Sequence, residues 1–158
     1  MFARATQIED TVNLIERAQA ALAWLGRFPL SVLQLAFRLS IAAVFWHAGM
    51  TKIANWDTTL ALFRDEYMVP VLPPALSAYM ATTIELTCPV LLFLGLATRL
   101  ATLPMLGQAL VIQVFVYPES WIEHLSWATT LVFILTRGPG ALSLDHLIAR
   151  RYSDRRGM

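Results

Sequence analysis

The 158-residue sequence has few of the residues on which soluble, disulfide-bonded and zinc-binding proteins depend. Its single cysteine, Cys88, excludes an intramolecular disulfide, a CxxC redox pair and a cysteine-rich zinc site. Only 15% of the residues are charged, against about 25% in soluble domains. The net charge of +1 provides no basic surface for nucleic acid, so we expect no nucleic-acid partner. By contrast, 57% of the residues are hydrophobic, which in so small a chain indicates an integral membrane protein.

Four long apolar runs predict an all-α membrane protein, folded as a bundle of four transmembrane helices in the lipid bilayer. Each run is long enough, or nearly so, to cross about 30 Å of hydrocarbon as a helix. Continuous apolar runs favour helices over the alternating segments of a barrel. Within a transmembrane domain of residues 29–137, the predicted spans are 29–54, 75–97, 100–117 and 120–136.

Shorter structured segments are predicted before, within and after the bundle. Residues 1–28 have apolar side chains at helical spacing, which is typical of an amphipathic helix lying on the membrane surface. The first loop predicts a short helix capped by Asp57 or Thr58, followed by a proline-rich extended stretch. We expect this loop to lie across the outer mouth of the bundle. In the basic tail, residues 138–158, Ser143 is expected to cap a short interfacial helix.

The distribution of arginine and lysine predicts the orientation of the chain. Nine of the twelve basic residues fall in the N-terminal arm, the second loop and the tail. The first and third loops, on the opposite side, are acidic. Because cytoplasmic segments carry the excess of basic residues, we expect a multi-pass protein of the bacterial cytoplasmic (inner) membrane with both termini in the cytoplasm.

Ionisable residues inside the predicted spans are the first candidates for function, because the membrane makes them costly. Glu85 lies near the middle of the second span, and Pro89 removes the backbone hydrogen bond that would reach the Glu85 carbonyl. One turn of helix therefore offers a carboxylate and a free carbonyl. Glu85 could pair with Arg38 or with Lys52 of the first span, and such an ion pair could serve packing alone.

The start of the fourth span has a second polar group. His124 and Trp127 there either belong to an interfacial aromatic belt or place His124 inward as a proton carrier or ligand. Gln108 and Gln113 of the third span are expected to make hydrogen bonds between helices.

A metal site is weakly indicated. His47 and Met50 share a helix face, and together with Cys88 they offer ligands that suit Cu(I). No chelating motif is present, and methionine and cysteine also fill gaps in apolar cores, so packing is the favoured reading. A haem held by His47 and His124 is disfavoured, because histidines alone do not establish one and the sequence has no CxxCH attachment signal.

An ordered set of motifs resembles the DoxX family over residues 29–150. The set comprises Phe37-Arg38-Leu39, His47-Ala48-Gly49-Met50-Thr51-Lys52, Glu85 with Pro89, Leu94-Gly95-Leu96-Ala97-Thr98-Arg99 and Gly138-Pro139-Gly140-Ala141-Leu142-Ser143-Leu144-Asp145. The resemblance implies a four-helix membrane bundle of a family named for the small subunit of a thiosulfate:quinone oxidoreductase. Other members are linked to redox homeostasis or metal stress.

The resemblance also bears on individual residues. Arg38, Lys52, Glu85 and Asp145 match the recurrent polar positions of the family, whereas His47 departs from its pattern. Residues 55–74 resemble one subgroup, typically encoded beside multinuclear iron oxidases that modify small copper-binding peptides. This implies such an iron oxidase, or its peptide product, as a partner in copper stress.

Two functions follow as hypotheses, and the sequence leaves open whether the chain is an enzyme. The first is a quinone-linked redox partner, in which Arg38, Glu85 and His124 would move protons. Arg38, Lys52, Glu85 and Trp127 would hold the quinone, and electrons would come from a partner, because the sequence has no motif for a redox centre of its own. The second is an exporter or docking scaffold without chemistry, which as a transporter would have to be a homo-oligomer.

Overall fold

The computed structural model describes residues 15–156, with side chains described as far as residue 153. The apolar residues Ile8 and Val12 of the predicted N-terminal arm therefore lie outside the described residues, as do the side chains of Arg155 and Arg156. The chain divides into two units, residues 1–30 and 31–158. In the first unit, residues 15–25 form a helix whose side chains are exposed. Its predicted position on a membrane surface stays a prediction.

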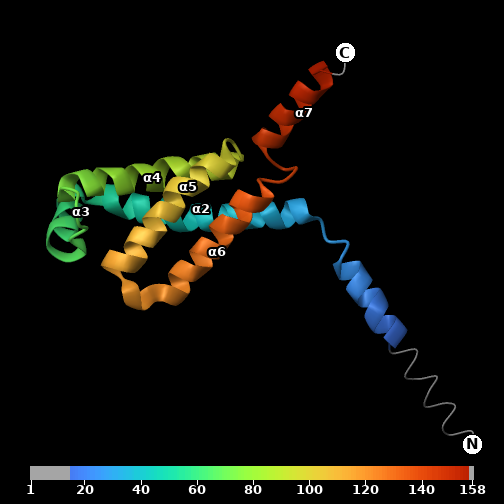
Figure 1. Ribbon diagram of the computed structural model, residues 1–158, viewed down its shortest axis with the longest axis horizontal. Helices are drawn as coiled ribbons and strands as arrows, with labels where there is room; N and C mark the ends of the chain where they lie inside the picture. The colour runs from blue at the N-terminus through green and yellow to red at the C-terminus, as the bar shows by residue number, and fades with distance from the viewer. Residues whose placement is uncertain (1–14, 157–158) are drawn as a thin grey trace, which may run out of the picture. The chain divides into compact units, whose positions relative to one another are not determined.

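The second unit is built from helices, and no residue in the described range 15–156 is in a strand. Long helices that follow one another in the chain pack together: α4 packs against α5, and α5 packs against α6 (Figure 1). The long helices are α2 (Leu30–Ala54), α4 (Pro74–Leu94), α5 (Thr98–Val111, continued by the π-helical turn η2, Ile112–Val116) and α6 (Trp121–Arg137). The short ones are α3 (Trp56–Leu62), the π-helical turn η1 (Phe63–Tyr67), the 3-10 turn η3 (Pro118–Ser120) and α7 (Leu144–Arg156).

Three of the described helices are long and apolar enough to cross a membrane, namely Leu30–Ala54, Pro74–Leu94 and Thr98–Val116. The fourth predicted span corresponds to α6, which has 17 residues and falls just short of the usual length. α6 packs along α5. The spanning role of α6, and with it the count of four spans, stays a prediction, as does the orientation of the chain.

Two helix ends differ from the sequence-based expectations, each for a local reason. α4 ends at Leu94, before residue 97, because Gly95 takes a left-handed conformation (φ +69°) and its N–H bonds the carbonyls of Leu91 and Leu92. α3 is capped by Asn55 and not by Asp57 or Thr58. The Asn55 backbone is extended, and its side-chain oxygen accepts a hydrogen bond from the Thr58 N–H at 3.0 Å.

The apolar core lies where the long helices cross. α2 and α4 approach closely at Gly49, where an added Cβ would lie 2.8 Å from the Leu86 side chain. The rings of Phe45 on α2 and Trp127 on α6 meet edge to face, with their centroids 5.7 Å apart. The fully buried members of the core include Leu92, Met105, Leu131 and Ile134.

At one end of the bundle, two polar side chains of α2 hold the segment that follows α6. Gln34 Nε2 donates to the carbonyls of Arg137 and Gly138, both at 3.2 Å. Arg38 Nη1 donates to the Pro139 carbonyl at 2.8 Å. Because Gln34 and Arg38 are both buried, these bonds satisfy donors that would otherwise be costly in an apolar setting. We call this arrangement the terminal clamp.

Asp145 extends the terminal clamp to the turn between α4 and α5. Its carboxylate accepts hydrogen bonds from the N–H groups of Ala97 and Thr98, at 2.8 and 3.0 Å, and so caps the start of α5. The Asp145 N–H donates to the Gly95 carbonyl at 2.9 Å. Ser143 Oγ accepts from the His146 N–H at 3.2 Å, which confirms the predicted cap of α7.

Candidate functional site

A cavity of about 670 Å³ lies among α2, α4, α5 and α6, and we call it the central cavity. Side chains of η1, of the loop after it and of η2 also line it. Most of its wall is apolar or aromatic, which is typical of sites for small lipid-soluble molecules. The side chains in this wall that carry ionisable, amide or hydroxyl groups are Lys52, Tyr67, Ser77, Glu85, Gln108, Tyr117, Ser120, Glu123 and His124.

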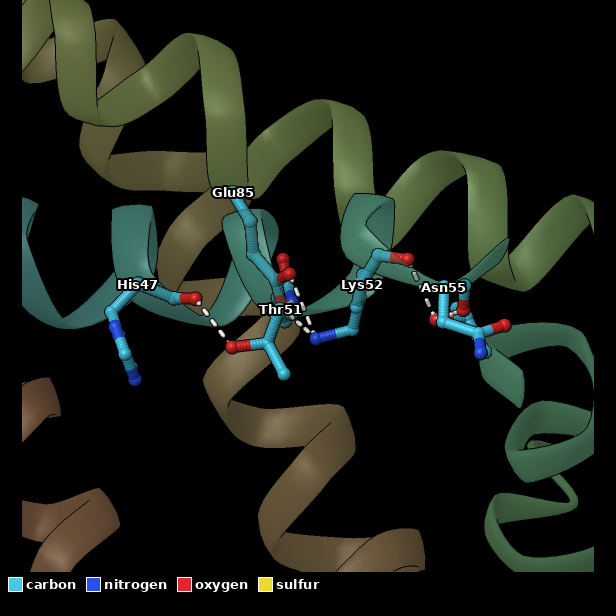
Figure 2. Close-up of polar contacts among 7 residues, drawn as sticks. His47, Thr51, Lys52, Asn55 and Glu85 are labelled. Atoms are coloured by element: carbon cyan, nitrogen blue, oxygen red, sulfur yellow. Dashed lines mark hydrogen bonds and ion pairs between the residues drawn. The ribbon is translucent and has the colours of Figure 1, made fainter. Parts of the chain in front are cut away.

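A polar cluster from three helices forms part of the cavity wall. Lys52 Nζ of α2 lies 2.8 Å from each carboxylate oxygen of Glu85 on α4. Figure 2 shows the two side chains directed toward each other. Gln108 Nε2 of α5 donates to the same carboxylate, which confirms that Gln108 bonds between helices. The Glu85 side chain is only 3% exposed. The cluster therefore places one positive and one negative charge in the bundle without a net charge.

The structure separates Arg38 from this cluster. Of the two partners that the sequence offered Glu85, Lys52 is the one that pairs with it. Arg38 is 1% exposed, bonds the Pro139 carbonyl in the terminal clamp and does not line the central cavity. The predicted contact of Arg38 with a quinone head therefore has no counterpart at this cavity, because Arg38 lies at the other end of α2, where its Nη1 bonds the Pro139 carbonyl.

His124 faces inward. It is 5% exposed, lines the central cavity, and its Nδ1 lies 2.8 Å from Oε1 of Gln113 on η2. The imidazole also lies against the Trp127 ring, with centroids 5.0 Å apart. Lys52, Glu85, His124 and Trp127, all named from the sequence, thus line one cavity.

The weak metal candidates do not come together. Cys88 is buried in the apolar core, whereas His47 and Met50 are exposed. Figure 2 shows the His47 ring directed away from the Lys52–Glu85 pair. Within the part of the chain that the structure describes, no group of three or more His, Cys, Asp or Glu side chains is placed to hold a metal ion.

A small lid, formed by α3, η1 and residues 68–73, contributes to the cavity wall. Phe63, Tyr67 and Leu72 of the lid line the cavity, and Phe63 is buried against the Tyr67 ring. The lid is joined to the end of η2 by Tyr117, whose hydroxyl donates to Glu66 Oε1 at 2.7 Å. The Tyr67 and Tyr117 rings also meet edge to face at 5.8 Å. We call the contact of Tyr117 with Glu66 and Tyr67 the latch. Sequence reasoning missed it, because Glu66 and Tyr117 are 51 residues apart and no local pattern joins them.

The latch gives a prediction for the pH dependence of Tyr117. The hydrogen bond to Glu66 is the main cause that raises the Tyr117 pKa, because it favours the neutral phenol. A raised pKa means that the latch stabilises the fold below the ordinary tyrosine pKa, about 10, and that this contribution is lost only at more alkaline pH. We expect a spectrophotometric titration to show a tyrosine that loses its proton only at unusually alkaline pH, and we expect Tyr117→Phe to remove that step. If the step at unusually alkaline pH persists in Tyr117→Phe, the raised pKa does not belong to Tyr117.

Three helices long and apolar enough to cross a membrane, two of them joined by a buried ion pair, indicate a membrane protein. The profile of the DoxX family matches residues 33–118. The chain belongs to the DoxX family. An uncharacterized protein of Haemophilus influenzae is 28% identical over 128 residues, covering 75% of this chain and 84% of the relative. No solved structure matches the chain.

Proposed function

We propose that this DoxX-family protein binds a quinone-type molecule in the central cavity and acts as a quinone-linked redox partner. The observation that carries the proposal is a 670 Å³ cavity with a mostly apolar wall and the Lys52–Glu85–Gln108 cluster in that wall. Such a cavity suits a molecule with an apolar body and one polar head. Lipid-soluble quinones are molecules of this kind, with an apolar body and a polar head.

The aromatic and ionisable side chains around the cavity support the same ligand class. The ring of Trp127, packed on Phe45, offers an aromatic surface on which a flat head can stack. His124 and Glu85 are groups that can accept or deliver the protons that accompany quinone chemistry. The electrons would pass to or from a partner protein.

A cavity-filling variant tests the proposal. Gly107 lines the cavity, and an added Cβ there meets no atom within 4 Å. We expect Gly107→Leu to fold normally and to abolish binding of the quinone-type molecule, because the leucine occupies its space. The measurement is chromatography of the lipid-soluble quinones that copurify from native membranes, compared between the original protein and the variant.

The matched control adds bulk at an exposed position of the same helix that does not line the cavity. Leu110 is 64% exposed and does not line the cavity, so Leu110→Phe should retain the quinone. A protein that copurifies with no quinone, and whose cavity takes up none when quinone is added, would contradict the proposal. It would favour the docking-scaffold alternative.

The lid carries the proposed link to copper stress. The stretch that resembles the iron-oxidase-associated subgroup, residues 55–74, forms α3, η1 and the loop to α4. This segment is where we propose that a peptide-modifying iron oxidase, or its peptide product, docks. Deletion of the protein should then lower copper tolerance or peptide modification. Restoration by the original chain, but not by one with substituted exposed lid residues such as Arg64 and Asp65, would locate the contact.

A further inference from the structure

We infer that Gln113 holds His124 in one tautomer, with the proton on Nδ1, so that Nε2 accepts a hydrogen bond from a hydroxyl group on the ligand. The inference rests on the proposed function and narrows it. It defines the ligand as a lipid-soluble molecule whose aromatic head bears a hydroxyl, as in a phenol or a hydroquinone. Such a head donates a hydrogen bond, whereas the head of a quinone or an aryl ether only accepts one.

The hydrogen bond to Pro118 determines the orientation of the Gln113 amide. Gln113 Nε2 donates to the Pro118 carbonyl at 2.9 Å, across the turn between η2 and η3. A carbonyl oxygen only accepts hydrogen bonds, so the amide must direct its NH₂ group to Pro118. The Gln113 oxygen is therefore the atom that remains for His124, from which it lies 2.8 Å away.

The tautomer of His124 follows from that orientation. An amide oxygen cannot donate, so the hydrogen between Gln113 Oε1 and His124 Nδ1 belongs to the imidazole. A neutral imidazole carries one N–H, and with Nδ1 protonated its Nε2 has a free lone pair. Gln113 is in this sense a positioning residue, because it acts through His124.

The free Nε2 is accessible. It has no hydrogen-bond partner within residues 15–153, and it is not among the polar atoms that are fully enclosed by protein. Because His124 is 5% exposed and lines the central cavity, the cavity is the space from which a ligand would reach Nε2. The neighbouring Trp127 ring, 5.0 Å from the imidazole, favours an aromatic head at that place.

The donors in the cavity strengthen the argument. The Lys52 ammonium and the Gln108 NH₂ group both donate to Glu85. Each of these two groups thus has a partner within the protein, whereas His124 Nε2 has none within the described residues. A ligand hydroxyl would satisfy the Nε2 acceptor, whereas a ligand head that only accepts hydrogen bonds would leave it without a partner.

A pair of probes that differ only in the donor tests the inference. The full-length protein in lipid nanodiscs would be titrated with a 4-alkylphenol and with its methyl ether, which has nearly the same shape but no O–H. We expect the phenol to bind about tenfold more tightly, because the ether leaves Nε2 buried without a partner. With Gln113→Glu, a carboxylate would favour protons on both ring nitrogens, and the preference for the phenol should disappear.

Nitrogen NMR of labelled histidine reads the tautomer directly in the original protein, which needs no variant. We expect His124 to show a protonated Nδ1 and a bare Nε2, with His47 and His146 as internal references, and Gln113→Glu to show an imidazolium. A His124 protonated on Nε2, or equal binding of phenol and ether, would overturn the inference while leaving cavity binding intact. If neither probe binds, and if Gly107→Leu also leaves the amount of copurified quinone unchanged, the proposed function fails as well.

Discussion

Replacing Lys52 by methionine should destabilise the protein strongly, lowering its free energy of unfolding by about 3–5 kcal/mol. The variant keeps the apolar stem of the side chain but removes the ammonium that lies 2.8 Å from both oxygens of Glu85. The Glu85 carboxylate, 3% exposed, would be left with the Gln108 amide as its remaining hydrogen-bond donor. An uncompensated buried charge of this kind costs more than the pair contributes when both partners are present.

The reciprocal variant is the control. Glu85→Gln removes the negative charge, but Lys52 is 18% exposed and its long stem can carry the ammonium toward water. We therefore expect a smaller loss for Glu85→Gln. The double variant should be more stable than Lys52→Met alone. Unfolding in detergent, followed by circular dichroism, measures all three, and equal losses in the two single variants would contradict this account of the pair.

Gly95→Ala is expected to lower stability by several kcal/mol, although it adds one methyl group. An added Cβ would lie 2.5 Å from the Ser143 Cβ, 2.6 Å from Arg38 Nη1 and 2.9 Å from the Ser143 backbone. The φ of +69° adds strain, because a side chain there disfavours the left-handed conformation. The backbone of the tail would have to move, and the bond from Arg38 to Pro139 would be lost with it.

The same substitution at Gly107 is the matched control. Gly107 lies within α5, and its added Cβ meets no atom within 4 Å. Gly107→Ala should stabilise the protein by roughly 0.5–1 kcal/mol, because alanine favours the helix over glycine. The two variants thus shift the melting temperature in opposite directions. A loss of stability at Gly107 as large as the loss at Gly95 would show that the terminal clamp is not the cause.

The sequence predicts the local features of this fold well and its pairings less well. Long apolar runs predict the helices, because hydrophobicity and length are local properties. The cost of a charge in a membrane singles out Lys52 and Glu85. Which cation pairs with Glu85 depends on how α2 and α4 are placed along each other. Gly49 allows this approach, but the spacing of residues along one helix does not define it.

The terminal clamp and the latch show why the remaining contacts are beyond sequence reasoning. Arg38 bonds the main-chain carbonyl of Pro139. Because every residue has such a carbonyl, the residue types do not indicate which one will accept this bond. Tyr117 and Glu66 are ordinary residues for loops at a membrane surface, and only the fold brings them to 2.7 Å. The sequence named both His124 and Gln113, but not the contact between Gln113 Oε1 and His124 Nδ1, which again depends on the fold.

The contact between Arg38 and Pro139 has a consequence for the biosynthesis of the protein. The two residues are 101 positions apart, so the ribosome makes the arginine long before its acceptor. During that interval Arg38 lacks this acceptor, although an unpaired cation within a span is costly. The hydrogen bond from Arg38 to Pro139 can therefore form only when the segment after α6 has been made. A chain shortened before Pro139 would expose α2 to the proteases that remove unassembled membrane proteins.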